Sequence, residues 1–239
     1  STEWTSRTSP LKDESLPIPD RPRDKLFSAL RPSSVGEDSQ RRPLGRSTRE
    51  FDTSLRESAM ISAIVLAAGT SSRMGRAKAL EPLAGRPLLH HVLRNLEASQ
   101  VGEIVVVLGH EADRVRRETP LADATVVVNP NYALGMSTSL RVGLRAIQSS
   151  AEAFFAVLAD QPLVSPATLD ALIARRYESK ARILIPTYAG IRGNPVLVDR
   201  SLSGEVEAIT GDQGCRAIFG DYADDILEVE VTSNRPDWL

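Results

Sequence analysis

The segment from Leu66 to Lys78, LAAGTSSRMGRAK, places small and basic residues directly after an apolar run. Small residues such as Gly69 and Gly75 let backbone N–H groups approach an anion, and Arg73 and Lys78 can neutralise its charge. Two familiar glycine loops are excluded, because no glycine stands two residues after Gly69, and Gly75 is followed by Arg-Ala instead of Lys-Ser or Lys-Thr. The segment therefore predicts a phosphate-binding loop of another kind, with a solvated basic turn as the alternative.

Asp160 is a carboxylate suited to hold a metal ion beside this loop. It follows the apolar run from Phe154 to Leu158 by two residues, which puts it at the exposed carboxyl end of a predicted strand. Mg²⁺ prefers oxygen ligands and is commonly held by one or two carboxylates together with substrate phosphates. Asp before Gln-Pro is also an ordinary turn sequence, so a structural role is the alternative. We expect Asp160 to bind Mg²⁺ and to form the catalytic set with Arg73 and Lys78.

Short runs rich in β-branched residues predict the strands that position these side chains. Their nearly continuous apolar character is typical of parallel strands buried on both faces, and they span residues 62–66, 103–108, 124–128, 154–158 and 182–185. Helical spacing of apolar residues follows Pro87 up to Leu96, and a second helix is predicted from Pro166 to Tyr177 with Ser165 as its N-cap. This alternation predicts an α/β fold, a three-layer sandwich around a Rossmann-like, mostly parallel sheet. Its site is expected at the carboxyl ends of the strands.

A second candidate segment runs from Asn129 to Ser139 and follows the third predicted strand. Gly135 permits tight passage of the backbone. The residues from Gly135 to Ser139 are also suited to begin a helix that continues through Leu140, Leu144 and Ile147. The two roles are compatible with each other.

The composition excludes several other classes of protein. With 239 residues, a net charge of -2 and a pI near 6.0, the chain lacks the basic character that nucleic-acid binding requires. No apolar run approaches the roughly 20 residues of a membrane-spanning helix. The single cysteine, Cys215, excludes an intrachain disulfide and fits a reducing compartment. We expect a cytoplasmic protein that binds neither nucleic acid nor membrane.

Residues 1–59 differ in character from the rest of the chain. They mix Pro, Ser, Arg, Asp and Glu with single apolar residues that follow no period. Such a stretch buries too little apolar surface to offset its ordering entropy, so we expect a disordered extension. The alternative is a partner-binding arm around Phe27 and Leu30. Dense apolar runs begin just after Met60, and we expect residues 60–239 to form the folded domain.

The string LAAGTSSRMGRAKALEPLAGRPLLHHVL resembles the opening signature of the MobA-like nucleotidyltransferases. Further matches to that family are NPNYALGMSTSL at 129–140, DQP at 160–162, GNPVL at 193–197 and GDQGCR at 211–216. The combination is most similar to the molybdenum cofactor cytidylyltransferases. The resemblance implies a fold of the nucleotide-diphospho-sugar transferase type. It also implies a Mg²⁺-dependent reaction that joins CMP from CTP to the phosphate of molybdopterin and releases pyrophosphate.

The resemblance also implies roles for individual residues. On the acceptor side it points to Asn194, and in related guanylyltransferases a glycine stands where this chain has Ala68. The Ala68 methyl group restricts the room for a purine, which favours CTP over GTP. The nucleotide would be bound by Leu66, Ala67, Ala68, Gly69, Arg73, Lys78 and Ser139.

Two other functions stay open. One is a guanylyltransferase or sugar-phosphate nucleotidyltransferase of the same fold. The other is a non-catalytic nucleotide-binding module that delivers cofactor to a molybdenum hydroxylase, directly or through its chaperone. The chain departs from the family at its end, where VTSNRPDWL stands in place of an acidic DIDTP-like segment that supplies a second carboxylate. We therefore expect weaker metal binding and a domain that is cut short or altered at its C-terminus.

Overall fold

The computed structural model describes residues 60–69, 77–121 and 123–231 of the chain. The expected disorder of residues 1–59, the role of Arg73 and the C-terminal departure from residue 232 onward lie outside the described residues. Within the described part, strands and helices alternate as the sequence predicts.

Five of the ten strands of the described residues fall close to the predicted runs, and the other five were not predicted. The ten are β1 (Met60–Ala67), β2 (Pro82–Leu83), β3 (Arg86–Pro87), β4 (Glu103–Leu108), β5 (Thr125–Val128), β6 (Ala151–Leu158), β7 (Ile183–Tyr188), β8 (Ile191–Arg192), β9 (Val196–Asp199) and β10 (Ile226–Glu230).

The α-helices are α1 (Leu88–Glu97), α2 (Ala112–Glu118), α3 (Met136–Ala146), α4 (Pro166–Glu178) and α5 (Ser203–Ala208). Short 3-10 turns are η2 (Lys78–Leu80), η3 (Tyr132–Leu134), η4 (Arg200–Leu202), η5 (Cys215–Ile218) and η6 (Ala223–Asp225). The predicted caps are confirmed at two helices. The hydroxyl of Ser165 accepts a hydrogen bond from the backbone N–H of Thr168 at 3.2 Å, and α3 begins directly after Gly135.

The main sheet of the described residues has eight strands, seven of them in the order β10-β7-β9-β6-β1-β4-β5, with β8 paired to β7. Strand β1 lies between β4 and β6 and is parallel to both, and β5 is parallel to β4. Strand β9 is antiparallel to both of its neighbours, β6 and β7. The predicted α/β fold with a mostly parallel sheet is confirmed.

The antiparallel strand β9 follows from the length of its connection. A parallel crossover needs a dozen or more residues, and the chain between Tyr188 and Val196 is shorter than that and includes the hairpin strand β8. The chain must therefore reverse its direction after β7, so that β9 runs antiparallel to β7 on one side and to β6 on the other. Strands β9 and β10 were not predicted as strands, because the sequence pattern marked the first only as part of a GNPVL motif.

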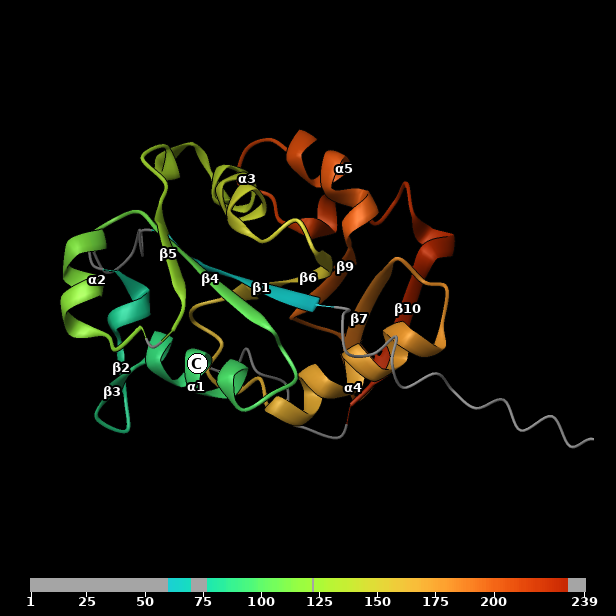
Figure 1. Cartoon of the computed structure of the whole chain (residues 1–239), viewed down its shortest axis with the longest axis horizontal. Helices are drawn as coiled ribbons and strands as arrows, with labels where there is room; N and C mark the ends of the chain where they lie inside the picture. Colours follow the sequence, from blue (N-terminus) through green and yellow to red (C-terminus); the bar gives the residue numbers. More distant parts are fainter. Residues whose placement is uncertain (1–59, 70–76, 122, 232–239) are drawn as a thin grey trace, which may run out of the picture. The chain divides into compact units, whose positions relative to one another are not determined.

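Helices cover both faces of the sheet, which gives the three layers that the sequence predicts. Figure 1 shows α3 and α5 on one face, and α1 and α4 on the other. The two faces have separate buried clusters. One contains Leu89 of α1 and Leu172 of α4, and the other contains Leu140 of α3 and Val206 of α5. None of the described helices is long and apolar enough to cross a membrane.

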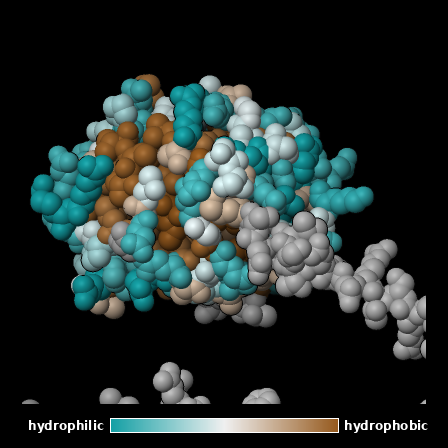
Figure 2. Space-filling model, in the orientation of Figure 1, coloured by the Kyte–Doolittle hydropathy of each residue, from teal (hydrophilic) through white to brown (hydrophobic). Residues whose placement is uncertain are grey.

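Strand β5 forms one edge of the sheet, and its side chains are only partly covered. Figure 2 shows a broad apolar area where β4 and β5 lie in Figure 1. Val128, the last residue of β5, is 42% exposed. The inner strands are more buried, as in β1, where Ile61 to Val65 are at most 2% exposed, and in β4, where Val105 to Leu108 are completely buried.

The packing of α3 on the sheet depends on a glycine. A Cβ atom at Gly143 would lie 2.3 Å from Ile64 Cγ2 and 3.2 Å from Val107 Cγ2, whereas a Cβ atom at Gly204 of α5 meets nothing within 4 Å. We expect Gly143→Ala to lower the free energy of unfolding by about 1–3 kcal/mol through overpacking. Gly204→Ala should raise it by up to about 1 kcal/mol through helix propensity. Urea denaturation of both variants measures the difference, and equal effects would contradict the close packing of α3.

Candidate active site

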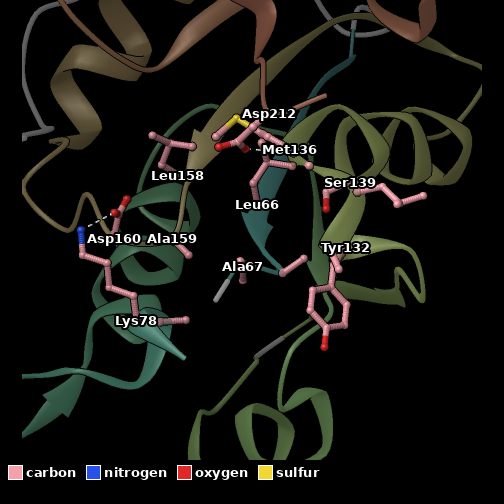
Figure 3. A pocket seen from close by; sticks show the side chains of 16 residues that line it. Leu66, Ala67, Lys78, Tyr132, Met136, Ser139, Leu158, Ala159, Asp160 and Asp212 are labelled. Atoms are coloured by element: carbon pink, nitrogen blue, oxygen red, sulfur yellow. Dashed lines mark hydrogen bonds and ion pairs between the residues drawn. The ribbon is translucent and has the colours of Figure 1, made fainter. Parts of the chain in front are cut away.

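A pocket of about 520 Å³ opens at the carboxyl edge of the sheet. Its floor comes from the ends of β1 and β6, and its far wall comes from the segment that leads into α3 (Figure 3). The pocket is lined by Leu66, Ala67, Ala68, Gly69, Lys78, Ala79, Tyr132, Ala133, Leu134, Gly135, Met136, Ser139, Leu158, Ala159, Asp160 and Asp212.

The register of β1 and β6 brings two distant segments together at this pocket. Leu66 is paired with Leu158 in the parallel ladder, and the backbone N–H of Ala159 donates to the carbonyl of Leu66 at 3.2 Å. Each strand then leaves the sheet at the same edge. Asp160 therefore lies beside the segment that begins at Leu66, as expected from the sequence.

Lys78 and Asp160 form an ion pair at one side of the pocket. Lys78 Nζ lies 2.6 Å from Asp160 Oδ2, and the two side chains are 45% and 31% exposed. A partly exposed pair of this kind contributes only about 0–1 kcal/mol to stability. The contact therefore matters for its position and not for stability. It holds a cation and a carboxylate together at the mouth of a pocket (Figure 3).

Asp160 is suited to a metal ion only in combination with a ligand. Among the described residues, no cluster of three or more His, Cys, Asp or Glu side chains could hold a metal ion by itself. Mg²⁺ needs no such cluster, because it is often held by one carboxylate, substrate phosphates and water. The donor set fits Mg²⁺ that binds together with a phosphate-bearing substrate.

The wall opposite the ion pair is held by a buried asparagine. Asn129 is 1% exposed, and its side-chain N–H groups donate to Thr138 Oγ1 at 2.8 Å and to Ser139 Oγ at 2.9 Å. Its side-chain oxygen accepts from the backbone N–H of Asn131 at 2.9 Å. Asn129 thus ties the start of α3 to the turn before η3, which fixes Ser139 and Tyr132 in the wall across from Lys78 and Asp160 (Figure 3).

Asp212 lines the pocket although it was not predicted as a site residue. Its Oδ1 accepts from the backbone N–H of Met136 at 3.2 Å, and the carbonyl of Gly211 accepts from the N–H of Ser137 at the same distance. The approach requires glycine at position 135, where φ is 112° and a Cβ atom would lie 2.4 Å from the Gly211 backbone. The GDQGCR motif was the sequence signal for this contact, but the pattern does not say what it packs against.

The predicted site residues that the structure describes divide into two groups. Leu66, Ala67, Ala68, Gly69, Lys78, Ser139 and Asp160 all line the pocket. Asn194 does not line it. The Asn194 carbonyl accepts from the Tyr188 hydroxyl at 2.8 Å, and the acceptor-side role of the residue stays a prediction.

Cys215 and His91 are side chains of types that can do chemistry, but they lie outside the pocket. Burial raises the pKa of the Cys215 thiol to about 12, so the thiolate that a nucleophile requires is scarce at neutral pH. His91 Nε2 lies 2.8 Å from the carbonyl oxygen of Leu83, the last residue of β2.

Solved structures resemble this chain over most of its length. The crystal structure of Rv0371c from Mycobacterium tuberculosis H37Rv matches with a TM-score of 0.67 at 30% identity, over 75% of this chain and 92% of that one. A crystal structure of Rv0371c in complex with manganese matches with a TM-score of 0.65 at 29% identity, over 74% and 91% of the two chains.

Two curated relatives carry different names. The bifunctional protein GlmU of Lactococcus lactis subsp. cremoris is 34% identical over 149 residues, which cover 62% of this chain and 32% of GlmU. The chain thus spans about a third of the length of that relative. Nicotine blue oxidoreductase of Paenarthrobacter nicotinovorans is 31% identical over 168 residues, 66% of this chain and 81% of that protein.

A family model covers most of the part of the chain that folds around the pocket. It is described as the MobA-like NTP transferase domain and matches residues 63–226, from β1 to the start of β10. The matched range includes every described residue that lines the pocket. The chain therefore belongs to the MobA-like NTP transferase domain family.

Proposed function

We propose that this chain is a Mg²⁺-dependent nucleotidyltransferase that joins CMP from CTP to the phosphate of molybdopterin. The observation that carries the proposal is the 2.6 Å contact between Lys78 Nζ and Asp160 Oδ2 beside the small residues Ala67 to Gly69. A cation for phosphate oxygens and a carboxylate for a metal ion are the two charges that nucleotidyl transfer requires. The pocket volume, about 520 Å³, is in the range of small-molecule sites.

In the proposed reaction, an oxygen of the acceptor phosphate forms a bond to the α-phosphorus of the nucleotide. The bond from that phosphorus to the bridging oxygen of the β-phosphate breaks, and its electron pair leaves with pyrophosphate. Lys78 exchanges Asp160 for phosphate oxygens and neutralises the charge that grows on the leaving group. Asp160, once released from Lys78, is free to coordinate a metal ion.

Mg²⁺ would be held by Asp160 and substrate phosphate oxygens, where it would supply positive charge against the departing pyrophosphate. The manganese complex of the relative Rv0371c supports a divalent metal in this family. The residues from Ala67 to Gly69 have at most a methyl side chain, which leaves room for phosphates to approach the backbone. We infer that Arg73 adds a second cation, in keeping with the sequence analysis.

The base is proposed to lie between the end of β1 and the start of α3. Ala68 and Ser139 both line the pocket there, and both are nearly buried. Ala68 packs closely on Gly109, because a Cβ atom added at Gly109 would lie 2.8 Å from the Ala68 Cβ and carbonyl oxygen. A methyl group held in this way narrows the site on the side where a purine would need room, which supports CTP over GTP.

The acceptor and the cellular setting are further parts of the proposal. Molybdopterin is the proposed acceptor, and a molybdenum hydroxylase or its chaperone would receive the product in the cytoplasm. Transfer to a sugar phosphate, use of GTP, or nucleotide binding without turnover are the competing functions. A screen of four nucleoside triphosphates against molybdopterin and sugar phosphates, with mass spectrometry of the products, separates these alternatives.

The base preference yields the first functional prediction. With Mg²⁺ and molybdopterin, the protein should release pyrophosphate faster from CTP than from GTP. Ala68→Gly should shift the CTP-to-GTP ratio of kcat/KM toward GTP by roughly 5- to 150-fold, because one methyl group decides about 1–3 kcal/mol. Equal rates for both nucleotides in the unmodified protein would contradict the assignment of the base.

The metal role of Asp160 yields the second functional prediction. Asp160→Asn should lower kcat by about 100-fold or more, as expected when a group that stabilises transition-state charge is removed. Its free energy of unfolding should change by less than about 1 kcal/mol, because the pair with Lys78 is partly exposed.

Asp224→Asn is the matched control for that variant. Asp224 is an exposed carboxylate of η6 that does not line the pocket. The Asp224→Asn variant should release pyrophosphate at the same rate as the unmodified protein in the same assay. Full activity of the Asp160→Asn variant would rule out either the metal role or catalysis at this pocket.

A further inference from the structure

We propose that Glu111 is a positioning residue that fixes Ala77 and, through it, the place of the Lys78 ammonium group at the pocket. The inference rests on the proposed function for its catalytic consequence. Glu111 does not line the pocket, and no motif of the sequence marks it. Its role is inferred from contacts that it makes across the fold.

The Glu111 carboxylate makes a long-range contact with the residue before Lys78. Glu111 Oε2 accepts a hydrogen bond from the backbone N–H of Ala77 at 2.8 Å, across 34 residues of sequence. Glu111 Oε1 accepts from Arg114 Nη1 at 3.0 Å, and Arg114 Nε donates to Glu118 at 2.8 Å. The carboxylate is therefore held in place from α2 while it holds Ala77.

The neighbouring residues hold the other flank of the segment between Gly69 and Ala77. The backbone N–H of His110 donates to the carbonyl of Ala68 at 3.1 Å. Gly109 packs so closely on Ala68 that a Cβ atom there would lie 2.8 Å from the Ala68 carbonyl oxygen. One tripeptide at the end of β4, residues 109–111, thus contacts the described residues on both sides of that segment.

The backbone of Glu111 has an unusual conformation, which supports a specific role for its side chain. Its φ of 51° and ψ of 32° are left-handed, a conformation uncommon for residues other than glycine, asparagine and aspartate. Glu111 occupies the N-cap position of α2, yet its side chain makes no capping hydrogen bond to that helix. A residue in an unfavourable conformation persists where its surroundings require it, and here the contact with Ala77 supplies such a requirement.

The contact is strong because the acceptor is charged. The N–H of Ala77, and then the Arg114 guanidinium, hold the pKa of the Glu111 carboxyl below its usual value. A group with a lowered pKa in the folded state keeps its contribution at neutral pH and loses it only in acid. Hydrogen bonds to ionised acceptors are roughly twice as strong as neutral ones, so the contact should hold across the neutral range.

The test uses four variants of the full chain. Glu111→Ala removes the acceptor, and Glu111→Gly removes it while it also relieves the left-handed backbone. Glu111→Gln keeps an oxygen acceptor for Ala77. Glu118→Ala is the matched control, because it removes the other carboxylate on Arg114 with the same change of charge. The readouts are amide hydrogen exchange over residues 77–80, affinity for inorganic tripolyphosphate, and the kcat and KM of pyrophosphate release from CTP.

We expect Glu111→Ala and Glu111→Gly to speed exchange over residues 77–80 by about tenfold or more, the factor expected for loss of a charge-assisted hydrogen bond. Both should weaken tripolyphosphate binding and raise KM for CTP by a similar factor. Glu111→Gln should recover most of each loss, and Glu118→Ala should change neither exchange nor affinity. Recovery by Gln separates the contact with Ala77 from a general effect of charge.

Three results would overturn the inference. One is unchanged exchange over residues 77–80 in both Glu111→Ala and Glu111→Gly. Another is faster exchange with unchanged tripolyphosphate affinity, because Glu111 would then hold Ala77 without any effect on the site. The third is an equal effect of Glu118→Ala. If the unmodified protein binds no triphosphate, the proposed function fails, and the exchange data alone still decide whether Glu111 fixes Ala77.

Discussion

The parallel pairing of β1 with β6 is the constraint on which the candidate site depends. It sets Leu66 against Leu158, so that the two strands end together and release Gly69 and Asp160 at one edge of the sheet. Strand β1 can take this central place because its residues from Ile61 to Val65 are almost completely buried. The contact of Lys78 with Asp160 spans 82 residues of sequence, and it exists only because this pairing has closed that distance.

The strands of the inner sheet could be predicted because their signal is local. Runs such as EIVVVL and FFAVL are apolar throughout, which is typical of strands buried on both faces. Strand β10, ILEVE, has a weaker alternating pattern, and β9 is only four residues long beside a turn motif. The antiparallel direction of β9 comes from the short connection after β7 and from the partners on each side. No pattern within the strand itself reports these partners.

The residues of the candidate site also differ in whether their sequence signal is local. Leu66 to Gly69, Lys78 and Asp160 could be predicted because small, basic and acidic residues stand directly after apolar runs. Asp212 and Glu111 were missed because their contacts, with Met136 and Ala77, join segments that are 76 and 34 residues apart. In the sequence, no motif distinguishes Glu111 from other charged residues. Its side chain makes no capping hydrogen bond to α2. It instead accepts a hydrogen bond from Ala77, in another part of the chain.

The central claim is that Lys78 and Asp160 mark the place where a metal-bound nucleoside triphosphate reacts. Anomalous diffraction from crystals grown with Mn²⁺ and a non-hydrolysable CTP analogue tests it most directly. We predict a Mn²⁺ peak coordinated by a carboxylate oxygen of Asp160 and by phosphate oxygens of the analogue. Lys78 Nζ should have moved from Asp160 to a phosphate oxygen. A metal ion without contact to Asp160, or an analogue bound away from Ala67 to Gly69, would contradict the account.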